Sequence, residues 1–534
     1  MYRDYLLRSF RNELLLFPLV TLILICSIFF IPSRYEENDD VIMSWIASGF
    51  ISGEPSMFLI FSNIIIGYVL KFFYQVSPET PWYSLYLYFF HWFALTIFVI
   101  YSRNFLPEKL RFSFWASVIF LEYYFLTNLQ FTTTAGMVGI AGVILLVKSS
   151  NTDYWFRVLS LIALASSFMI RKEAFYLIIG LSGFFLLQKV WKNWGGVKFT
   201  ILTFMVILCL WGIDKYHYTS DPDLNGFVKY NQIRGELEHK IMNNYAFNPK
   251  IWTLEELNLY RSFYLESPEK YSLKELQYEN DNAPKFSIDY KSRLIELVRH
   301  FCSSKFRIIL AFWILFLTGW IIWKQGSSIL LNLIPSIVLT FYVSLFMIMK
   351  DRVLYVILFF ALLVLVCSIK QHNFIILKVL PALLILSVLY AYIKSAAINR
   401  DINLEIHKSM EFLISYDPSK IVHLWPSDPD IENIRPIQNK YSWKNKNNLY
   451  IMGWLSNSPF NTKILRHRQS DTFYQSLSEG KGVLAVNPVK RKKVLKDLIV
   501  HFDNLYGGTH DLKEVRKFFT KTDTIQMLQL VRNP

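Results

Sequence analysis

The stretch RYEENDDVIMSWIASGFISGEPS, residues 34–56, follows an apolar run that ends in ILICSIFFIPS, and it opens with a tight group of carboxylates. These carboxylates are Glu36, Glu37, Asp39 and Asp40. Asn38 or Asp39 is suited to cap the N-terminus of a short helix. Behind that cap, apolar or small residues share one helical face: Ile42, Trp45, Ile46, Gly49 and Phe50. The pattern predicts an amphipathic helix that lies along a membrane surface, holds the carboxylates at the lipid–water boundary and ends in the turn SGEP.

The composition around this stretch is that of a membrane protein, with 53% hydrophobic and 17% aromatic residues. Many nearly uncharged windows reach the roughly 17–22 residues that cross a ~30 Å hydrocarbon core as a helix. They are 14–31, 57–75, 82–101, 112–128, 134–148, 156–170, 174–188, 199–213, 306–323, 328–349, 353–369 and 374–393. We therefore predict an all-α polytopic membrane protein with about 12–13 transmembrane helices. The net charge of +15 fits cytoplasmic loops and anionic lipid rather than nucleic acid.

Positive charge predicts the topology. Arg3, Arg8 and Arg11 precede the first span, so the N-terminus is expected in the cytoplasm and the acidic stretch outside. The basic loop that starts at residue 102 is expected inside, although two apolar runs, 57–75 and 82–101, precede it where an odd number of crossings is needed. Three explanations stay open: one run is re-entrant, part of 41–56 is embedded in the membrane, or the charge rule fails there.

Four segments follow from this topology. We predict an N-terminal transmembrane module at 1–213 with its first outer loop at 32–56, an extracytoplasmic helical insert at 214–304, further transmembrane helices at 305–394, and a small extracytoplasmic α/β domain at 395–534. In the insert, FVKYNQIRGELEHKIM has a helical pattern. In the last segment, SKIVHLW, NLYIMGW and KGVLAV read as strands, whereas VKRKKVLKDLIVHF and HDLKEVRKFFTK read as amphipathic helices.

Dense charge groups interrupt apolar sequence on the expected outer side. They are the triplet Arg171, Lys172 and Glu173 and the triplet Lys350, Asp351 and Arg352. Charges beside a membrane are costly, so they pair or serve a site; the alternative is that each triplet is an ordinary loop between helices. A carboxylate of the acidic stretch can act as a general base or ligate a divalent metal ion, unless it is only a solvated helix cap.

A cytoplasmic N-terminus, one span and an outer acidic pair that heads an amphipathic helix resemble the GT-C superfamily, membrane glycosyltransferases that use polyprenyl-phosphate sugars. The outer insert, the outer C-terminal domain and, more weakly, QFTTTAG, IRKEAF and KDRVLY fit the same plan. The chain departs from it in that QFTTTAG has no acidic residue, where some relatives carry one, and in that the tail has no WWDYG-like motif. The resemblance implies that Asp39 or Asp40, with Asp40 favoured, is the catalytic base or orients the acceptor. It also implies that basic residues at the outer span edges bind the lipid phosphate.

The chemistry of such a transfer supports these assignments. Departure of a polyprenyl phosphate develops negative charge that fixed cations must stabilise, and the planar fork of arginine suits phosphate best. Arg352 and Arg171 are the candidates, with Lys172 and Lys350 in support. Asn231 and Arg234, one helical turn apart, are candidates to recognise a sugar or phosphate, unless they form a solvated helix face. Trp45, Trp82 and Tyr83 are either sugar-stacking residues or interfacial anchors.

The predicted function is inverting transfer of a sugar from a polyprenyl-phosphate donor to a glycan, lipid or protein acceptor at the outer face of the plasma membrane. A divalent metal ion stays open as a cofactor. One alternative is a transporter or flippase of lipid-linked glycans. Transporters tend to show internal repeats and midplane charges, whereas this sequence shows no repeat and its conspicuous charges lie at one face. Another is a glycan polymerase or ligase, which would use outer-loop arginines without an essential acid in the first loop.

Overall fold

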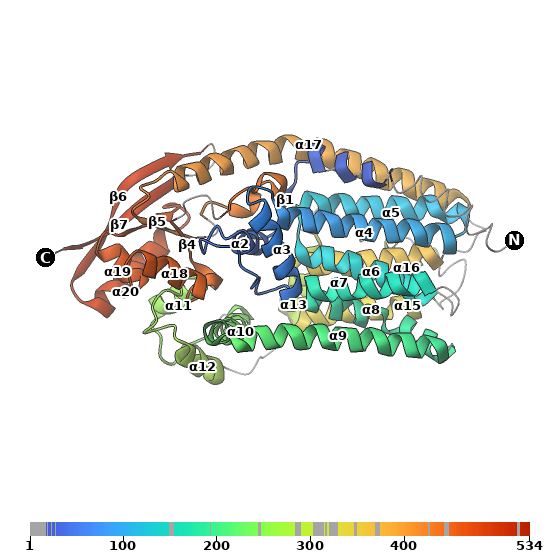
Figure 1. Ribbon diagram of the computed structural model, residues 1–534, viewed down its shortest axis with the longest axis horizontal. Coiled ribbons are helices and arrows are strands. Elements are labelled where there is room, and N and C mark those ends of the chain that lie inside the picture. The colour runs from blue at the N-terminus through green and yellow to red at the C-terminus, as the bar shows by residue number, and fades with distance from the viewer. Residues whose placement is uncertain are drawn as a thin grey trace.

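The structure is a computed structural model. It describes residues 18, 20–22, 24–26, 28–148, 154–192, 194–243, 247–283, 290–302, 314–315, 318–319, 329–346, 350–368, 374–425, 428–442, 448–520 and 524–533. A bundle of long helices occupies one end of the molecule, and a mixed sheet with short helices occupies the other (Figure 1).

Apolar sequence of helical length forms the bundle. Its helices are α4 (Trp82–Phe105), α5 (Glu108–Thr127), α6 (Phe131–Lys148), α7 (Tyr154–Ile170), α8 (Lys172–Lys192), α9 (Trp194–Ser220), α15 (Ile329–Phe346) and α16 (Asp351–Ser368). Helix α6 packs against α4, α7, α8 and α16, so it is central to the bundle. Small residues allow this packing: a Cβ added to Gly136 would lie 2.6 Å from Cγ2 of Val356 on α16. The longest helix, α17 (Phe374–Ile414), runs along the bundle and on toward the sheet (Figure 1).

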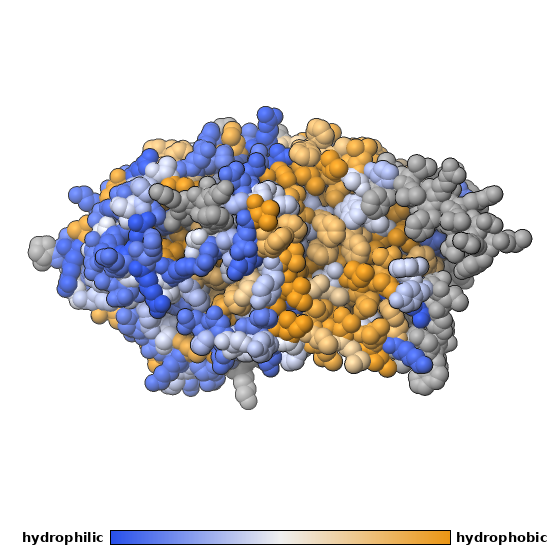
Figure 2. Space-filling view, viewed as in Figure 1, coloured by the Kyte–Doolittle hydropathy of each residue, from blue (hydrophilic) through white to orange (hydrophobic). Residues whose placement is uncertain are grey.

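The bundle carries the apolar surface expected of a membrane protein. Figure 2 shows hydrophobic residues over the bundle half of the visible face and hydrophilic ones over the sheet half. In the described part of the chain, three helices are long and apolar enough to cross a membrane, Trp82–Phe105, Phe131–Lys148 and Lys198–Ser220. A pair bent by 41°, Ala382–Lys394 and Ile398–Ile414, would be a fourth. The predicted count of about 12–13 spans stays a prediction, since windows such as 306–323 lie largely outside the described residues.

The length of helix α3 (Ile64–Val76) bears on the predicted topology, which needs an odd number of membrane crossings before the loop at residue 102. It has 13 residues, a length of about 20 Å at 1.5 Å per residue, which is shorter than the ~30 Å hydrocarbon core. Residues 57–63, the rest of that apolar run, are not helical. These lengths favour the explanation in which one of the two runs does not cross the membrane, with α4 as the crossing helix.

The C-terminal sheet has the strand order β4-β3-β5-β7-β6. Its strands are β3 (Ile421–Leu424), β4 (Leu449–Ile451), β5 (Gly482–Val486), β6 (Thr509–Phe519) and β7 (Thr524–Asn533). Strand β3 is parallel to β4 and β5, and β7 is antiparallel to β5 and β6. The three predicted strands are confirmed as β3, β4 and β5, and VKRKKVLKDLIVHF forms α20 (Lys492–Tyr506) as predicted.

The prediction of a helix over HDLKEVRKFFTK is wrong, because Thr509–Phe519 form strand β6. Charged residues recur along the segment at a spacing that resembles the solvated face of an amphipathic helix, and this resemblance led to the wrong prediction. Pairing with the apolar strand β7 decides the outcome, with Leu512 opposite Leu530 and Phe518 opposite Ile525. The ring of Phe518 stacks on Phe412 of α17 at 5.0 Å, which adds a long-range contact that no local pattern reveals.

Six further helices of the described residues lie in the predicted insert and in the C-terminal part of the chain. They are α10 (Pro222–Asn243), α11 (Leu254–Arg261), α12 (Leu273–Asn282), α13 (Tyr290–Cys302), α18 (Pro459–His467) and α19 (Phe473–Ser478). The predicted helix FVKYNQIRGELEHKIM is confirmed within α10. Helix α11 packs on α20, and buried Ser267, which follows α11, lies 2.7 Å from Nε2 of His501 on α20. The four segment boundaries stay predictions, and the one at residue 395 falls inside α17.

Candidate functional site

A pair of very short strands brings the acidic stretch to the start of α6. Strand β1 (Arg34–Tyr35) lies parallel to β2 (Asn128–Leu129), with Arg34 opposite Asn128. Nε of Arg34 donates a hydrogen bond of 3.2 Å to Oδ1 of Asn128. Because α2 (Asn38–Ala47) begins just after β1 and α6 begins just after β2, the N-termini of the two helices meet.

Helix α2 is buried inside the protein, so the prediction of a helix on the membrane surface is wrong. Every residue from Asp40 to Ala47 is buried, and α2 lies between the bundle and the sheet (Figure 1). Nε1 of Trp45 donates a 3.2 Å hydrogen bond to Oδ1 of Asn439 in the C-terminal part of the chain. The apolar face of α2 was visible in the sequence, but residues almost four hundred positions later cover the helix, and the pattern could not show them.

The ends of α2 also differ from the prediction. The N-cap residue is Glu37 rather than Asn38 or Asp39, and its side chain makes no capping hydrogen bond. The helix ends at Ala47, before the turn SGEP. Gly49, predicted on the helical face, instead has φ +74°, a conformation that favours glycine.

Asp40 is the most deeply buried carboxylate of the acidic stretch, with 0% of its surface exposed. Its Oδ1 accepts hydrogen bonds from the hydroxyl of Tyr83 at 2.9 Å and from the backbone N–H of Phe131 at 3.1 Å. Its Oδ2 has no hydrogen-bond partner among the described residues. Burial raises the pKa of Asp40 well above its ordinary value, and the bonds from Tyr83 and Phe131 oppose that rise. A carboxyl with a raised pKa is a stronger base once it is ionised.

Arg352, at the start of α16, is held by the other carboxylates of the stretch. Its Nη1 lies 3.2 Å from Oε1 of Glu37, and its Nη2 lies 3.9 Å from Oδ2 of Asp39. The side chain of Arg352 is 13% exposed and that of Asp39 is 20% exposed. Burial raises the pKa of neighbouring Glu36 to about 8, although the charge of Arg352 acts in the opposite direction. The structure thus joins two regions of the sequence, KDR and ENDD, in one charged cluster.

Arg171 belongs to the same cluster. Its guanidinium lies over the rings of Phe131 at 4.8 Å and Phe61 at 5.1 Å, and its Nε lies 2.8 Å from Oε2 of Glu173. Burial lowers the pKa of Arg171, and the positive charge of Arg352 lowers it further, whereas Glu173, Asp39 and Asp40 raise it. The charges of the two candidate arginines and the two candidate carboxylates therefore act on one another.

The remaining cationic candidates face other groups. Lys172 is exposed, and its charge acts on Asp214 of α9. Lys350 is also exposed, and its charge acts on His239 of α10. Their predicted part in phosphate binding stays a prediction.

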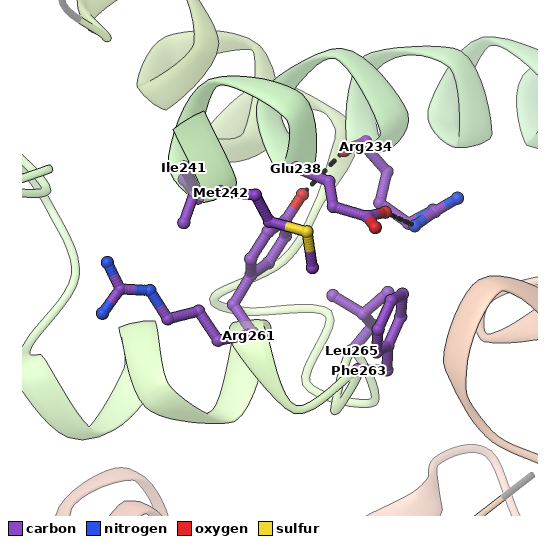
Figure 3. Close-up of a pocket in the computed structure, with 8 residues that line it drawn as sticks. Arg234, Glu238, Ile241, Met242, Arg261, Phe263 and Leu265 are labelled. Atoms are coloured by element: carbon purple, nitrogen blue, oxygen red, sulfur yellow. Dashed lines mark hydrogen bonds and ion pairs between the residues drawn. The ribbon is translucent and has the colours of Figure 1, made fainter. Parts of the chain in front are cut away.

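Asn231 and Arg234 bind each other on α10, as their spacing suggested. Nε of Arg234 donates to Oδ1 of Asn231 at 3.0 Å, and Nη1 of Arg234 lies 2.6 Å from Oε2 of Glu238. Figure 3 shows Arg234 and Glu238 beside a cavity that Phe263 and Leu265 also line. That cavity measures about 10 Å³, room for about one water molecule. It is too small for a sugar, so recognition by this pair stays a prediction.

The three aromatic candidates have structural partners. Tyr83 donates to Asp40, a role that the sequence did not suggest. Nε1 of Trp82 donates to the carbonyl of Ser77 at 2.9 Å, and Trp45 is buried against Asn439.

Sequence reasoning missed three further polar residues, His91, Glu122 and Asn439, all of them buried. His91 and Glu122 carried a signal, because ionisable residues inside apolar helices are costly and usually functional. Asn439 carried none. Among the residues that the structure describes, no group of three or more His, Cys, Asp or Glu side chains is arranged to hold a metal ion.

The sequence matches no family model and no curated protein. The structure, in contrast, is similar to ArnT from Cupriavidus metallidurans in the apo state, with a TM-score of 0.55 and 10% sequence identity over 97% of this chain and 98% of that chain. ArnT from the same organism bound to undecaprenyl phosphate gives a TM-score of 0.54, again at 10% identity and with the same coverage. This likeness shows the fold alone: the chain shares the fold of ArnT, which agrees with the resemblance drawn from the acidic stretch.

Proposed function

We propose that this chain is an integral membrane glycosyltransferase that moves a sugar from a polyprenyl-phosphate donor to a glycan, lipid or protein acceptor at the outer face of the membrane. The observation that carries the proposal is the cluster at the end of the bundle, where Asp39, Asp40 and Arg352 come together from segments far apart in sequence. The solved structure of ArnT with undecaprenyl phosphate supports a donor of this class.

The cationic side of the cluster suits a lipid phosphate. Arg352 and Arg171 are largely buried yet positively charged, so they can stabilise the negative charge that develops on a departing phosphate. The carboxylates Glu37 and Asp39 hold Arg352 before the lipid arrives. A phosphate would exchange with these carboxylates as partner of the guanidinium, whose planar fork matches phosphate oxygens.

The carboxylate side suits activation of a hydroxyl. In the proposed step, the acceptor oxygen attacks the anomeric carbon, the bond from that carbon to the phosphate oxygen breaks, and the hydroxyl proton passes to Asp40. The phosphate leaves with the bonding electron pair, opposite the incoming oxygen, so the configuration inverts. Asp40 is preferred to Asp39 because its Oδ2 has no other partner in the described part of the chain, whereas Asp39 faces Arg352.

The test is transfer from a panel of radiolabelled undecaprenyl-phosphate sugars by membranes that hold equal amounts of wild type, Asp39→Asn, Asp40→Asn or Arg352→Ala. Glu54→Gln is the matched control, since Glu54 belongs to the same stretch but pairs with Lys463 at the exposed surface. We expect Asp40→Asn to lose transfer while it still binds undecaprenyl phosphate, and Arg352→Ala to lose binding. Wild-type transfer by both Asp variants would refute the proposed base. Movement of lipid-linked glycan across the membrane without transfer would support a flippase instead.

A further inference from the structure

A buried pair of ionisable side chains lies inside the bundle, away from the cluster of Asp40 and Arg352. Nδ1 of His91 on α4 lies 2.9 Å from Oε1 of Glu122 on α5. The side chain of His91 is 0% exposed and that of Glu122 is 6% exposed. Taking both groups out of water is unfavourable, and their mutual attraction offsets that cost only with good geometry and further hydrogen bonds. A pair of this kind calls for a reason beyond stability.

The other nitrogen of His91 leads toward the site. Nε2 lies 2.9 Å from Oγ1 of Thr134 in the first turn of α6. The same Thr134 hydroxyl donates to the backbone carbonyl of Gln130 at 2.8 Å. A hydroxyl has one hydrogen, so where the Thr134 hydroxyl donates to Gln130 it accepts from Nε2 of His91. The contact of Nδ1 with Oε1 of Glu122 then fixes the orientation of the ring.

The carbonyl of Gln130 and the N–H of Phe131 belong to the same peptide group. That N–H is the donor to Oδ1 of Asp40, at 3.1 Å. The Thr134 hydroxyl is thus one of three donors to one end of a planar unit whose other end binds Asp40. The other two donors to the Gln130 carbonyl are the Thr133 hydroxyl at 2.9 Å and the Thr134 N–H at 3.0 Å. A carbonyl that accepts strong hydrogen bonds polarises its peptide group, so the N–H on the far side becomes a better donor.

We infer that His91 and Glu122 are positioning residues that act through Thr134 on the Gln130–Phe131 peptide group and thereby hold Asp40 in place. The inference rests on the proposed function, because it assigns the pair a part in the same reaction. The connection orients and does not conduct protons, since a peptide group relays a proton only by forming an unfavourable imidic acid. Neither side chain touches the reacting atoms.

The ionisation of Asp40 reports on this connection directly, without any substrate. In the purified protein in lipid nanodiscs, the infrared carbonyl band of the protonated Asp40 carboxyl is identified as the band lost in Asp40→Asn and is titrated with pH. Thr134→Val keeps the shape of the side chain but removes the hydroxyl. A weaker N–H donor stabilises the ionised carboxylate less, so we expect the midpoint to move to higher pH. Since neighbouring hydrogen bonds strengthen one another by roughly 10–30%, the expected shift is about 0.1–0.7 pH units.

Three further variants make the result specific. The double variant His91→Phe with Glu122→Leu removes both charges together, so it leaves no unpaired buried ion and should fold. It keeps the Thr134 bond to Gln130, so we expect a shift in the same direction as for Thr134→Val but smaller. Glu122→Gln should titrate like wild type, because its amide can donate to Nδ1 and keep the hydrogen on Nε2. Thr132→Val is the matched control, since the Thr132 hydroxyl has no hydrogen-bond partner among the described residues.

Transfer from the undecaprenyl-phosphate sugar panel provides the second measurement. We expect the acid limb of the pH profile to follow the infrared midpoint in each variant, with an unchanged plateau at high pH. A wild-type midpoint in both Thr134→Val and the double variant would overturn the inference and leave the proposed function standing. A shifted midpoint together with full transfer by Asp40→Asn would overturn the proposed base and leave the connection to Asp40 intact.

Discussion

Replacing Tyr83 with phenylalanine isolates one hydrogen bond to the proposed base. The Tyr83 hydroxyl donates to Oδ1 of Asp40 at 2.9 Å, and both groups are buried. Phenylalanine fills almost the same space and keeps the edge contact with the ring of Tyr86 at 5.2 Å. The substitution therefore removes the donor without opening a cavity.

The expected magnitude follows from the charge of the acceptor. A hydrogen bond to an ionised group contributes about 1.5–3 kcal/mol. Since a change of one pH unit in a pKa corresponds to about 1.36 kcal/mol, loss of the bond should raise the pKa of Asp40 further, by about one to two pH units. The base works only when ionised, so the rate below the midpoint should fall about 10- to 100-fold at a given pH. Above the new midpoint, the rate should return to the wild-type plateau.

The assay is the initial rate of sugar transfer at saturating donor, measured across pH for wild type, Tyr83→Phe and Tyr88→Phe. Tyr88 is the matched control because it is a buried tyrosine of the same helix whose hydroxyl lies 3.2 Å from Oγ of Ser33 rather than near Asp40. A fall in the Tyr83→Phe rate by the same factor at every pH would refute the reasoning, because Tyr83 would then act on something other than the ionisation of Asp40.

Three other substitutions test the surroundings of the site. Arg352→Ala should weaken undecaprenyl phosphate binding at least about tenfold in a competition assay, whereas Arg352→Lys, which keeps the charge but not the fork, should weaken it less. Gly136→Ala should lower the free energy of unfolding by about 1–3 kcal/mol, because the new Cβ would lie 2.6 Å from the side chain of Val356, one turn beyond Arg352. Gly183→Ala is the control and should leave the stability unchanged, because a Cβ there meets nothing within 4 Å. Burial raises the pKa of Glu266 from 4.5 to about 7, so the folded state retains its proton and the local stability should fall by about 3 kcal/mol as pH rises between those values. Hydrogen exchange should show that slope in wild type and lose it in Glu266→Gln.

Local patterns predicted the parts of this protein that local forces decide. The helix behind the acidic stretch and the helix around Leu498 were visible as helical periodicity. The strands around Val422 and Val483 were visible as short apolar runs, because both of their faces are buried. The resemblance built on the acidic stretch also led to the correct fold, although similarity at 10% identity is beyond what motif matching alone can detect.

Long-range contacts decided what the sequence could not predict. An amphipathic pattern states which face of α2 is apolar, but not that Asn439 contacts Trp45 on that face. It also could not show that Tyr83 and Phe131 contact Asp40, which is why burial of Asp40 was missed. Strand β6 was mistaken for a helix because its pairing partner, β7, lies later in the chain. His91 and Glu122 were detectable as single ionisable residues within apolar helices, but their mutual contact was not.

The hydrogen bond between Trp45 and Asn439 has a consequence for folding while the protein is being synthesised on the ribosome. The two residues are 394 positions apart in the chain. At about 5–20 residues per second, a ribosome needs roughly 20–80 s to make the intervening segment. During that interval, α2 has already been synthesised but lacks the amide that later closes over Trp45 and Ser44. The nascent chain thus carries the acidic stretch without its full surroundings. These surroundings are completed only after the C-terminal part of the chain that contains Asn439 has been made.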